Sequence, residues 1–387
     1  MRAAAKRRLL IVVGTRPEAI KLAPVVHALA DHSELFDIRV CATGQHREML
    51  DQALAFLEIK PDYDLNIMAP NQGPDDVVAG ILTGMKSLLR EDAPDLVMVQ
   101  GDTSTAFAAA LGAYYHRIPV AHVEAGLRTG DKYSPWPEEG NRRLIGALAR
   151  FHFAPTEEAR KNLLRERIDA ETIFVTGNTA VDAVLNIRGR FERDTALQRE
   201  TAQKFSKFDS EKRLILVTGH RRENFGEALA GICRALRRIV VAHPDVELVY
   251  PVHLNPSVRG PVFEILGNCD GPAMKRIHLI EPVDYISFVY LMMRAHIILT
   301  DSGGIQEESP SLGIPTLIMR NTTERAEAVR AGCARLVGTD EENIVAEATH
   351  LLSDDAHYAA MRQATNPFGD GKSAQRIADI VATEKWP

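Results

Sequence analysis

The chain has 387 residues, of which 45% are hydrophobic and 25% charged, values close to those of ordinary globular proteins. Its formal net charge of −6 argues against a nucleic-acid-binding protein, which usually carries a basic domain. The apolar run after the basic N-terminus covers only residues 9–13, too short for a signal peptide, and no window approaches the ~20 apolar residues of a membrane span. We therefore expect a cytoplasmic protein of two or three domains.

Short apolar runs rich in β-branched residues alternate with longer amphipathic segments. The predicted strands cover residues 9–13, 38–41, 96–100, 120–123, 151–154 and 173–176, and then 214–218, 246–252, 277–280, 297–300, 315–319 and 335–337. Predicted helices include 19–30, 103–115, 225–242 and 372–384. Continuous apolar strands separated by helices indicate parallel sheets that are covered on both faces. The expected fold class is α/β, with Rossmann-like doubly wound domains.

The alternation is interrupted at the polar, charged stretch 188–212, which we interpret as the region that joins two domains. The first domain is expected over residues 1–187 and the second, nucleotide-binding domain over 188–369. A last helix within residues 370–387 could pack on either domain, including back on the first.

Polar and glycine-rich segments follow the predicted strands. In the first half they include Gly14 to Lys21, Asp102 and Glu124, and in the second half 219–224, 253–255 and 301–304. In open parallel sheets, ligands bind beyond the carboxyl ends of the strands. Two such domains that face each other would bring these loops to one interdomain cleft.

The segment 301–308 suggests a phosphate site. Gly303 and Gly304 would let a diphosphate approach the backbone at a helix start, and Glu308 could accept hydrogen bonds from ribose hydroxyls. The alternative is an ordinary helix start capped by Ser302, and this segment alone leaves both interpretations open. Arg16 and Lys21 are similarly either surface residues or a phosphate clamp.

Several carboxylates fall where a ligand would bind. Asp102 and Glu124 end predicted strands, and Glu138 lies in a proline-rich loop segment. Carboxylates repel phosphate, so a group of them in a nucleotide site suggests proton transfer. The alternative is that each caps a helix or pairs with a nearby arginine: Arg128, Arg142 or Arg143.

The sequence predicts no metal and no nicotinamide cofactor. The four cysteines (residues 41, 233, 269 and 333) form no CxxC pair, and we find no carboxylate–histidine cluster with metal-ligand spacing. Residues 369–374 fit a bare GxGxxA pattern, but they follow a predicted turn instead of a strand. We interpret this segment as the turn that opens the last helix.

Taken together, the motifs resemble those of the bacterial non-hydrolysing UDP-N-acetylglucosamine 2-epimerases. The matching segments are residues 14–21, 45–50, 101–103, 122–129, 134–139, 218–223, 250–256, 301–308, 322–325 and 366–371. They span nearly the whole chain in the order of the family. The resemblance implies a GT-B-like fold, as in two-domain glycosyltransferases, a homodimer, and a role in polysaccharide biosynthesis.

The resemblance also implies roles for individual residues. The catalytic candidates are Asp102, Glu124, Glu138 and His220. The candidates for binding the UDP-sugar, with Phe288 against the uracil, are Arg16, Lys21, Phe288, Ser302, Gly303, Gly304, Glu308 and Arg325. A second UDP-GlcNAc molecule would act as an activator next to Gln45, Glu48, Arg221 and His253. Val283 stands where the family often has Gln, which would matter if that side chain contacts uracil.

The implied reaction interconverts UDP-N-acetylglucosamine and UDP-N-acetylmannosamine by elimination of UDP and re-addition through 2-acetamidoglucal. Oxidation by NAD is the other way to activate the C2 hydrogen, and the absent dinucleotide fingerprint disfavours it. The alternatives are a glycosyltransferase of the same architecture, a hydrolysing 2-epimerase, a 2-epimerase of a diacetamido uronic sugar nucleotide, and a non-catalytic sensor.

Overall fold

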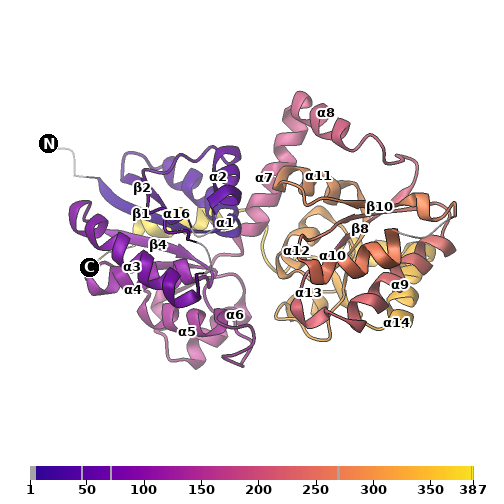
Figure 1. Cartoon of the computed structure of the whole chain (residues 1–387). Helices are drawn as coiled ribbons and strands as arrows, with labels where there is room; N and C mark the ends of the chain where they lie inside the picture. Colours follow the sequence, from indigo (N-terminus) through magenta and orange to yellow (C-terminus); the bar gives the residue numbers. More distant parts are fainter. Residues whose placement is uncertain (1–5, 45–46, 70–71, 268–270, 385, 387) are drawn as a thin grey trace. The chain divides into compact units, whose positions relative to one another are not determined.

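The computed structural model describes residues 6–44, 47–69, 72–267, 271–384 and 386, and it divides into two compact units (Figure 1). Unit 1 comprises Met1–Ala183 with Phe368–Pro387, and unit 2 comprises Val184–Pro367. The first division falls within helix α7 (Thr179–Arg193). Across the described ranges, no helix combines the length and the apolar character needed to cross a membrane.

Unit 1 is built on one parallel seven-stranded sheet in the order β3-β2-β1-β4-β5-β6-β7. Its strands are β1 (Arg7–Val13), β2 (Phe36–Ala42), β3 (Tyr63–Asp64), β4 (Leu96–Gln100), β5 (Val120–Val123), β6 (Phe151–Ala154) and β7 (Ile173–Val175). All of β4, β5 and β6 is buried, which explains why these strands read as continuous apolar runs instead of alternating ones.

The helices of unit 1 cover the sheet and connect its strands. They are α1 (Arg16–Ala30), α2 (Arg47–Phe56), α3 (Pro74–Glu91), α4 (Ser104–Tyr115), α5 (Glu138–Leu148), α6 (Glu157–Arg165), the start of α7, and α16 (Ser373–Thr383), with the 3-10 turn η1 (Ala170–Thr172). The C-terminal helix α16 returns to unit 1 and packs against α1 (Figure 1). The guanidinium of Arg7 in β1 donates to Ala382 O at 2.9 Å and lies 4.2 Å from the ring centre of Trp386.

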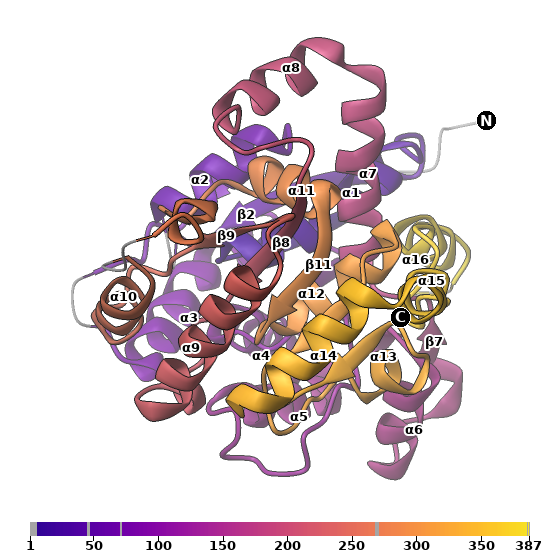
Figure 2. The same ribbon diagram turned by 90° about the vertical axis from the view of Figure 1, so that its right-hand side faces the viewer.

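Unit 2 has a parallel six-stranded sheet in the order β10-β9-β8-β11-β12-β13. Its strands are β8 (Arg213–Thr218), β9 (Val246–Pro251), β10 (Ile277–Ile280), β11 (Ala295–Thr300), β12 (Thr316–Ile318) and β13 (Ala334–Leu336). An apolar cluster of buried residues joins β8, β9, β11 and β12 to α9 and α14, two helices that pack side by side (Figure 2).

The helices of unit 2 include several short ones at the ends of strands. They are the rest of α7, α8 (Thr195–Lys204), α9 (Glu227–Ala242), α10 (Pro256–Val262), α11 (Tyr285–Arg294), α12 (Gly303–Glu308), α13 (Ala326–Arg330), α14 (Glu341–Ser353) and α15 (Asp355–Arg362), with the short turns η2 (Arg222–Asn224), η3 (Phe263–Gly267), η4 (Met274–Arg276) and η5 (Ser309–Leu312).

The prediction of two parallel-sheet α/β domains is confirmed, and every predicted strand lies within two residues of an observed one at each end. The two-residue strand β3 was not predicted because Tyr63 and Asp64 form no apolar run. The glycine-rich segment 369–374 follows a turn and leads into α16, as expected.

Most of the stretch 188–212, which we predicted to join the two domains, is helical. Ile187 and Phe191 of α7 are buried one turn apart, and Phe205 and Phe208 are also buried. The rings of Phe191 and Phe205 each lie 5.8 Å from that of Tyr290 on α11. A few well-spaced apolar residues therefore bury these helices despite their polar composition.

Candidate functional site

Glu124 is held by side chains from three other segments of unit 1. It follows β5 directly, with a backbone φ of 66°, a conformation uncommon outside glycine. Its carboxylate accepts hydrogen bonds from Lys21 Nζ on α1, from Gln100 Nε2 at 3.1 Å and from Asn178 Nδ2 at 3.3 Å. Only 9% of the residue is exposed. The side chain is therefore fixed at the carboxyl edge of the sheet, next to a cation.

Asp102 lies at the same edge, after β4, and pairs with Arg142 on α5. The Arg142 Nε and Nη2 atoms lie 2.8 and 2.7 Å from Asp102 Oδ2. Nη1 of the same guanidinium donates to fully buried Glu139 at 3.2 Å. Such charge-assisted bonds fix geometry strongly, so Arg142 connects the start of α5 to the end of β4.

Glu138 is the first residue of α5, and its Oε2 atom is buried without a hydrogen-bond partner among the described residues. A buried polar atom with no partner is uncommon in folded proteins and often marks a functional group. Its neighbour Glu139 behaves differently, because it accepts hydrogen bonds from Thr129 N, Arg142 and Arg143. Glu138 can therefore accept a hydrogen bond from a ligand, whereas the carboxylate oxygens of Glu139 are already occupied.

Glu18 is a buried carboxylate at this edge that the sequence reasoning did not select. It accepts hydrogen bonds from Gly14 N at 3.0 Å, Thr15 N at 2.7 Å and Thr103 Oγ1 at 2.6 Å. Complete burial raises its pKa to about 7, although these hydrogen bonds act in the opposite direction. The spacing of Thr15 and Glu18 is a capping-box signal for the start of α1, and this signal could have identified its structural role.

We expect Glu18→Gln to remove a pH dependence of stability. The folded-state pKa of about 7 lies above the ordinary 4.5, so the stabilising contribution is complete below pH 4.5 and is lost as the pH rises through 7. The shift corresponds to roughly 3 kcal/mol. Urea unfolding at pH 5 and pH 8 gives the free energy of unfolding of both proteins. From pH 5 to pH 8, this free energy should fall further in wild type than in the variant. A constant difference between the two proteins at both pH values would contradict this.

In unit 2, Asp301 organises the loop that carries His220. Its carboxylate is 1% exposed and accepts from His220 N and Arg221 N, both at 2.9 Å, and from Asn224 Nδ2 at 3.2 Å. The half-exposed imidazole of His220 stacks on His253, with ring centres 5.6 Å apart. Partial desolvation of the ring, together with Arg221 and His253, lowers the pKa of His220 against the opposing effect of Asp301, which favours a neutral imidazole near pH 7.

The start of α12 is braced by Arg325. A Cβ atom added to Gly303 would lie 3.2 Å from the Arg325 Cζ atom, whereas one added to Gly304 would meet no atom within 4 Å. Arg325 itself bonds Glu307 at 2.8 Å and Glu324 at 2.9 Å. Gly303 therefore makes room for the guanidinium. Gly304 faces open space in which a ligand could approach the backbone of the first turn of α12, where Ser302 is the N-cap.

A group of arginines around Glu324 adjoins this helix start. Glu324 lies 2.8 Å from Arg320, 2.9 Å from Arg325 and 3.6 Å from Arg221. Burial alone would raise its pKa, but these guanidinium groups outweigh burial and lower the pKa to about 2. Glu324 lies in the family-like segment 322–325, but neither it nor Arg320 or Asp301 carries a role that the sequence predicts. Their roles depend on contacts between segments far apart in the chain.

The remaining predicted residues are placed as follows. Glu308 is 7% exposed and accepts from Tyr285 Oη at 3.3 Å, while Phe288, on the same helix as Tyr285, is partly exposed. Arg16 is partly exposed and forms no ion pair with any described residue. Gln45 lies outside the described residues, and of Glu48 only its position in α2 is described. Val283 precedes α11 and is partly exposed.

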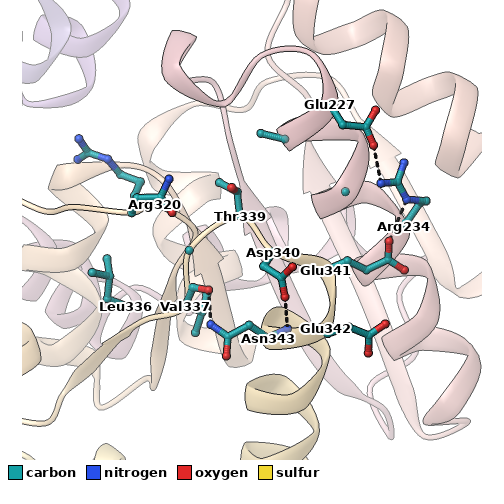
Figure 3. A pocket seen from close by; sticks show the side chains of 14 residues that line it. Glu227, Arg234, Arg320, Leu336, Val337, Thr339, Asp340, Glu341, Glu342 and Asn343 are labelled. Carbon is teal, nitrogen blue, oxygen red and sulfur yellow. Dashed lines mark hydrogen bonds and ion pairs between the residues drawn. The ribbon is translucent and has the colours of Figure 1, made fainter.

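A cavity of about 800 Å³ opens in unit 2 near the N-termini of α9 and α14 (Figure 3). No predicted site residue lines it. Its charged lining residues are Glu227, Arg234, Arg320, Asp340, Glu341 and Glu342, and Arg234 is already paired with Glu227 at 2.7 Å and with Glu341 at 2.9 Å. The excess of carboxylates would repel a diphosphate, so we do not assign the substrate to this cavity.

The structure also brings Glu347, His350 and His357 together at the junction of α14 and α15. The sequence analysis did not detect this carboxylate–histidine group, because His357 joins the other two from a separate helix. It lies apart from the residues above, which come from the carboxyl ends of the strands.

Two parallel-sheet α/β domains of this kind are typical of proteins with a GT-B-like architecture. The family model described as UDP-N-acetylglucosamine 2-epimerase matches residues 27–382. The chain belongs to the UDP-N-acetylglucosamine 2-epimerase family.

Individual relatives support the same assignment over nearly full length. The chain is 58% identical to the probable UDP-N-acetylglucosamine 2-epimerase of Ralstonia nicotianae, over 97% of this chain and 98% of the relative. It is 55% identical to the UDP-N-acetylglucosamine 2-epimerase of Escherichia coli K12, over 98% and 99%. The crystal structure of the Neisseria meningitidis enzyme bound to UDP-GlcNAc superposes with a TM-score of 0.91 at 46% identity, covering 97% of this chain and 100% of that chain.

Proposed function

We propose that this protein catalyses the reversible, non-hydrolytic epimerisation of UDP-N-acetylglucosamine at C2 to UDP-N-acetylmannosamine. One observation carries the proposal. This chain holds Asp102 and Glu124 at neighbouring strand ends, each against a cation, and one buried oxygen of Glu138 has no hydrogen-bond partner among the described residues. The Neisseria relative, by its description, binds UDP-GlcNAc.

The proposed reaction begins with elimination. A carboxylate takes the C2 proton, the C1–C2 double bond forms, and the C1–O bond breaks with its electron pair on the departing UDP. The product is 2-acetamidoglucal. An acid then delivers a proton to C2 from the opposite face, and the UDP oxygen adds back at C1. This sequence needs two or more acid–base groups, for which we propose Asp102, Glu124 and Glu138.

The nucleotide has its own proposed binding residues. Ser302, Gly303 and Gly304 would offer backbone N–H groups to the diphosphate, with Arg16, Lys21, Arg325 and His220 supplying charge or hydrogen bonds. Glu308 would accept from the ribose hydroxyls, and Phe288 would contact uracil. No metal or nicotinamide takes part in the proposed reaction. The support comes from the open space at Gly304 and from the cations nearby.

Incubation with UDP-N-acetylglucosamine in heavy water tests the proposal. We expect deuterium at C2 of both UDP-sugars and no free N-acetylmannosamine, as followed by NMR, with a sample lacking protein as the control. Free sugar plus UDP would indicate the hydrolysing reaction. UDP-sugar recovered without deuterium would contradict proton transfer at C2 and favour a transferase or a sensor.

We also propose that the protein works as a homodimer in the cytoplasm, that its product enters polysaccharide biosynthesis, and that a second UDP-GlcNAc molecule activates it next to Arg221 and His253. The stacking of His253 on His220 supports the last point, since it would connect an activator to the proposed catalytic set.

Analytical ultracentrifugation tests the proposed dimer by measuring the mass of the protein in solution. Rates strictly hyperbolic in UDP-GlcNAc, and unchanged by His253→Ala, would contradict the activation.

A further inference from the structure

We propose that Glu347, His350 and His357 form a binding site for a zinc-like divalent transition-metal ion. One possible ligand atom from each of the three side chains lies within 4.8 Å of the other two. Glu347 and His350 are three residues apart on α14, a spacing that puts both on one helix face, and His357 comes from the first turns of α15. The two helices are consecutive and meet at Asp354 (Figure 2).

Two atoms of this group are buried without a hydrogen-bond partner among the described residues: Glu347 Oε2 and His357 Nε2. The other oxygen of Glu347 is engaged, since Oε1 lies 2.8 Å from Arg335 Nη2. Buried polar atoms normally have partners, so two of them in one small group need an explanation. A metal ion bound between them would satisfy both.

The surroundings orient two of the proposed ligands, Glu347 and His357. Asp354 Oδ1 accepts from His357 N at 3.0 Å and thereby fixes the start of α15, while Oδ2 lies 3.4 Å from His350 Nε2. Arg335 holds the second oxygen of Glu347. A carboxylate beside a ligating imidazole, and a hydrogen bond to a ligating carboxylate, are usual outer contacts of metal sites in proteins.

The donor set indicates the class of ion. Two imidazole nitrogens and one carboxylate oxygen suit zinc and neighbouring transition metals, whereas calcium and magnesium prefer oxygen ligands alone. A tetrahedral zinc ion places its ligand atoms about 3.4 Å apart, so the group must contract slightly. The rings of His350 and His357 are stacked at 4.1 Å, and His350 is exposed, so a rotation of its side chain is open to it. Water would complete the coordination.

The position of the group separates it from the proposed reaction. Helix α14 begins after the carboxyl end of β13 and runs back along the sheet, and His350 lies in its last turn. On α15, Tyr358 stacks at 4.1 Å on His296, at the start of β11. The group therefore lies at the amino edge of the unit 2 sheet, whereas Gly303 and His220 follow the carboxyl ends. We infer that the ion ties α14 to α15 and takes no part in the chemistry.

Zinc titration of the full-length protein, freed of metal by EDTA, tests the site. Isothermal titration calorimetry should show one zinc fewer per chain, or zinc bound at least tenfold more weakly, in His350→Ala and in His357→Ala than in wild type. Zinc should raise the melting temperature of wild type but not of either variant. His116→Ala, which removes a histidine from unit 1, is the matched control and should bind as wild type does.

Cobalt gives an independent readout, because a tetrahedral site with nitrogen and oxygen ligands produces visible absorption bands. These bands should appear in wild type and in His116→Ala and be missing in Glu347→Gln. Wild-type zinc stoichiometry and affinity in His350→Ala would overturn the proposal, and we expect this variant to fold because the side chain is exposed. A wild-type protein that binds no zinc would overturn it equally.

Discussion

Glu138→Gln is expected to lower turnover of UDP-N-acetylglucosamine about 10²- to 10⁴-fold, the usual contribution of a positioned acid or base. The amide keeps the shape of the side chain but cannot exchange a proton with C2. Since Glu138 Oε2 has no partner among the described residues, no internal contact of that atom is lost. The melting temperature should stay close to that of wild type. Steady-state kinetics, deuterium incorporation and thermal unfolding measure the three effects.

The adjacent residue provides the control. Glu139 is fully buried and bonded to Thr129 N, Arg142 and Arg143, so Glu139→Gln breaks a buried charged network. Loss of one partner from such a network costs about 3–5 kcal/mol, and we expect a clear drop in melting temperature. Turnover of Glu138→Gln within threefold of wild type would remove Glu138 from the proposed mechanism.

Gly304→Leu is expected to weaken UDP binding at least tenfold while leaving the fold intact. A Cβ atom at this position meets no protein atom within 4 Å, and leucine is a better helix former than glycine by roughly 0.5–1 kcal/mol. The new side chain would occupy the space in which the diphosphate approaches the start of α12. Calorimetric titration with UDP measures the affinity, and a tenfold loss corresponds to about 1.4 kcal/mol.

Gly260→Leu is the matched control for this experiment. Gly260 is also a helical glycine of unit 2 at which an added Cβ atom would meet no atom within 4 Å, but it lies on α10, which contributes none of the proposed ligand residues. It should bind UDP as wild type does. Equal UDP affinity in Gly304→Leu and Gly260→Leu would show that the diphosphate binds elsewhere.

Much of the fold could be read from the sequence because parallel strands are buried on both faces. Strands such as β1 and β4 must then be apolar at nearly every position, and such runs are visible in a single chain. The same logic placed Asp102 and Glu124 at one edge of a sheet, since each lies within two residues of the end of a strand. The helices within 188–212 were missed because only a few residues, such as Phe191 and Phe205, bury them.

The amino-acid sequence thus determined the class of fold, the family, and which segments lie at the carboxyl ends of the strands. Only the tertiary structure decided which side chains meet there. Lys21 reaches Glu124 across 103 residues, and Arg142 reaches Asp102 across 40. His357 completes a group whose other members lie on a different helix. Hydrophobic periodicity is a local property of the chain, whereas hydrogen bonds, burial and the resulting pKa shifts arise from contacts between distant segments that exist only after folding.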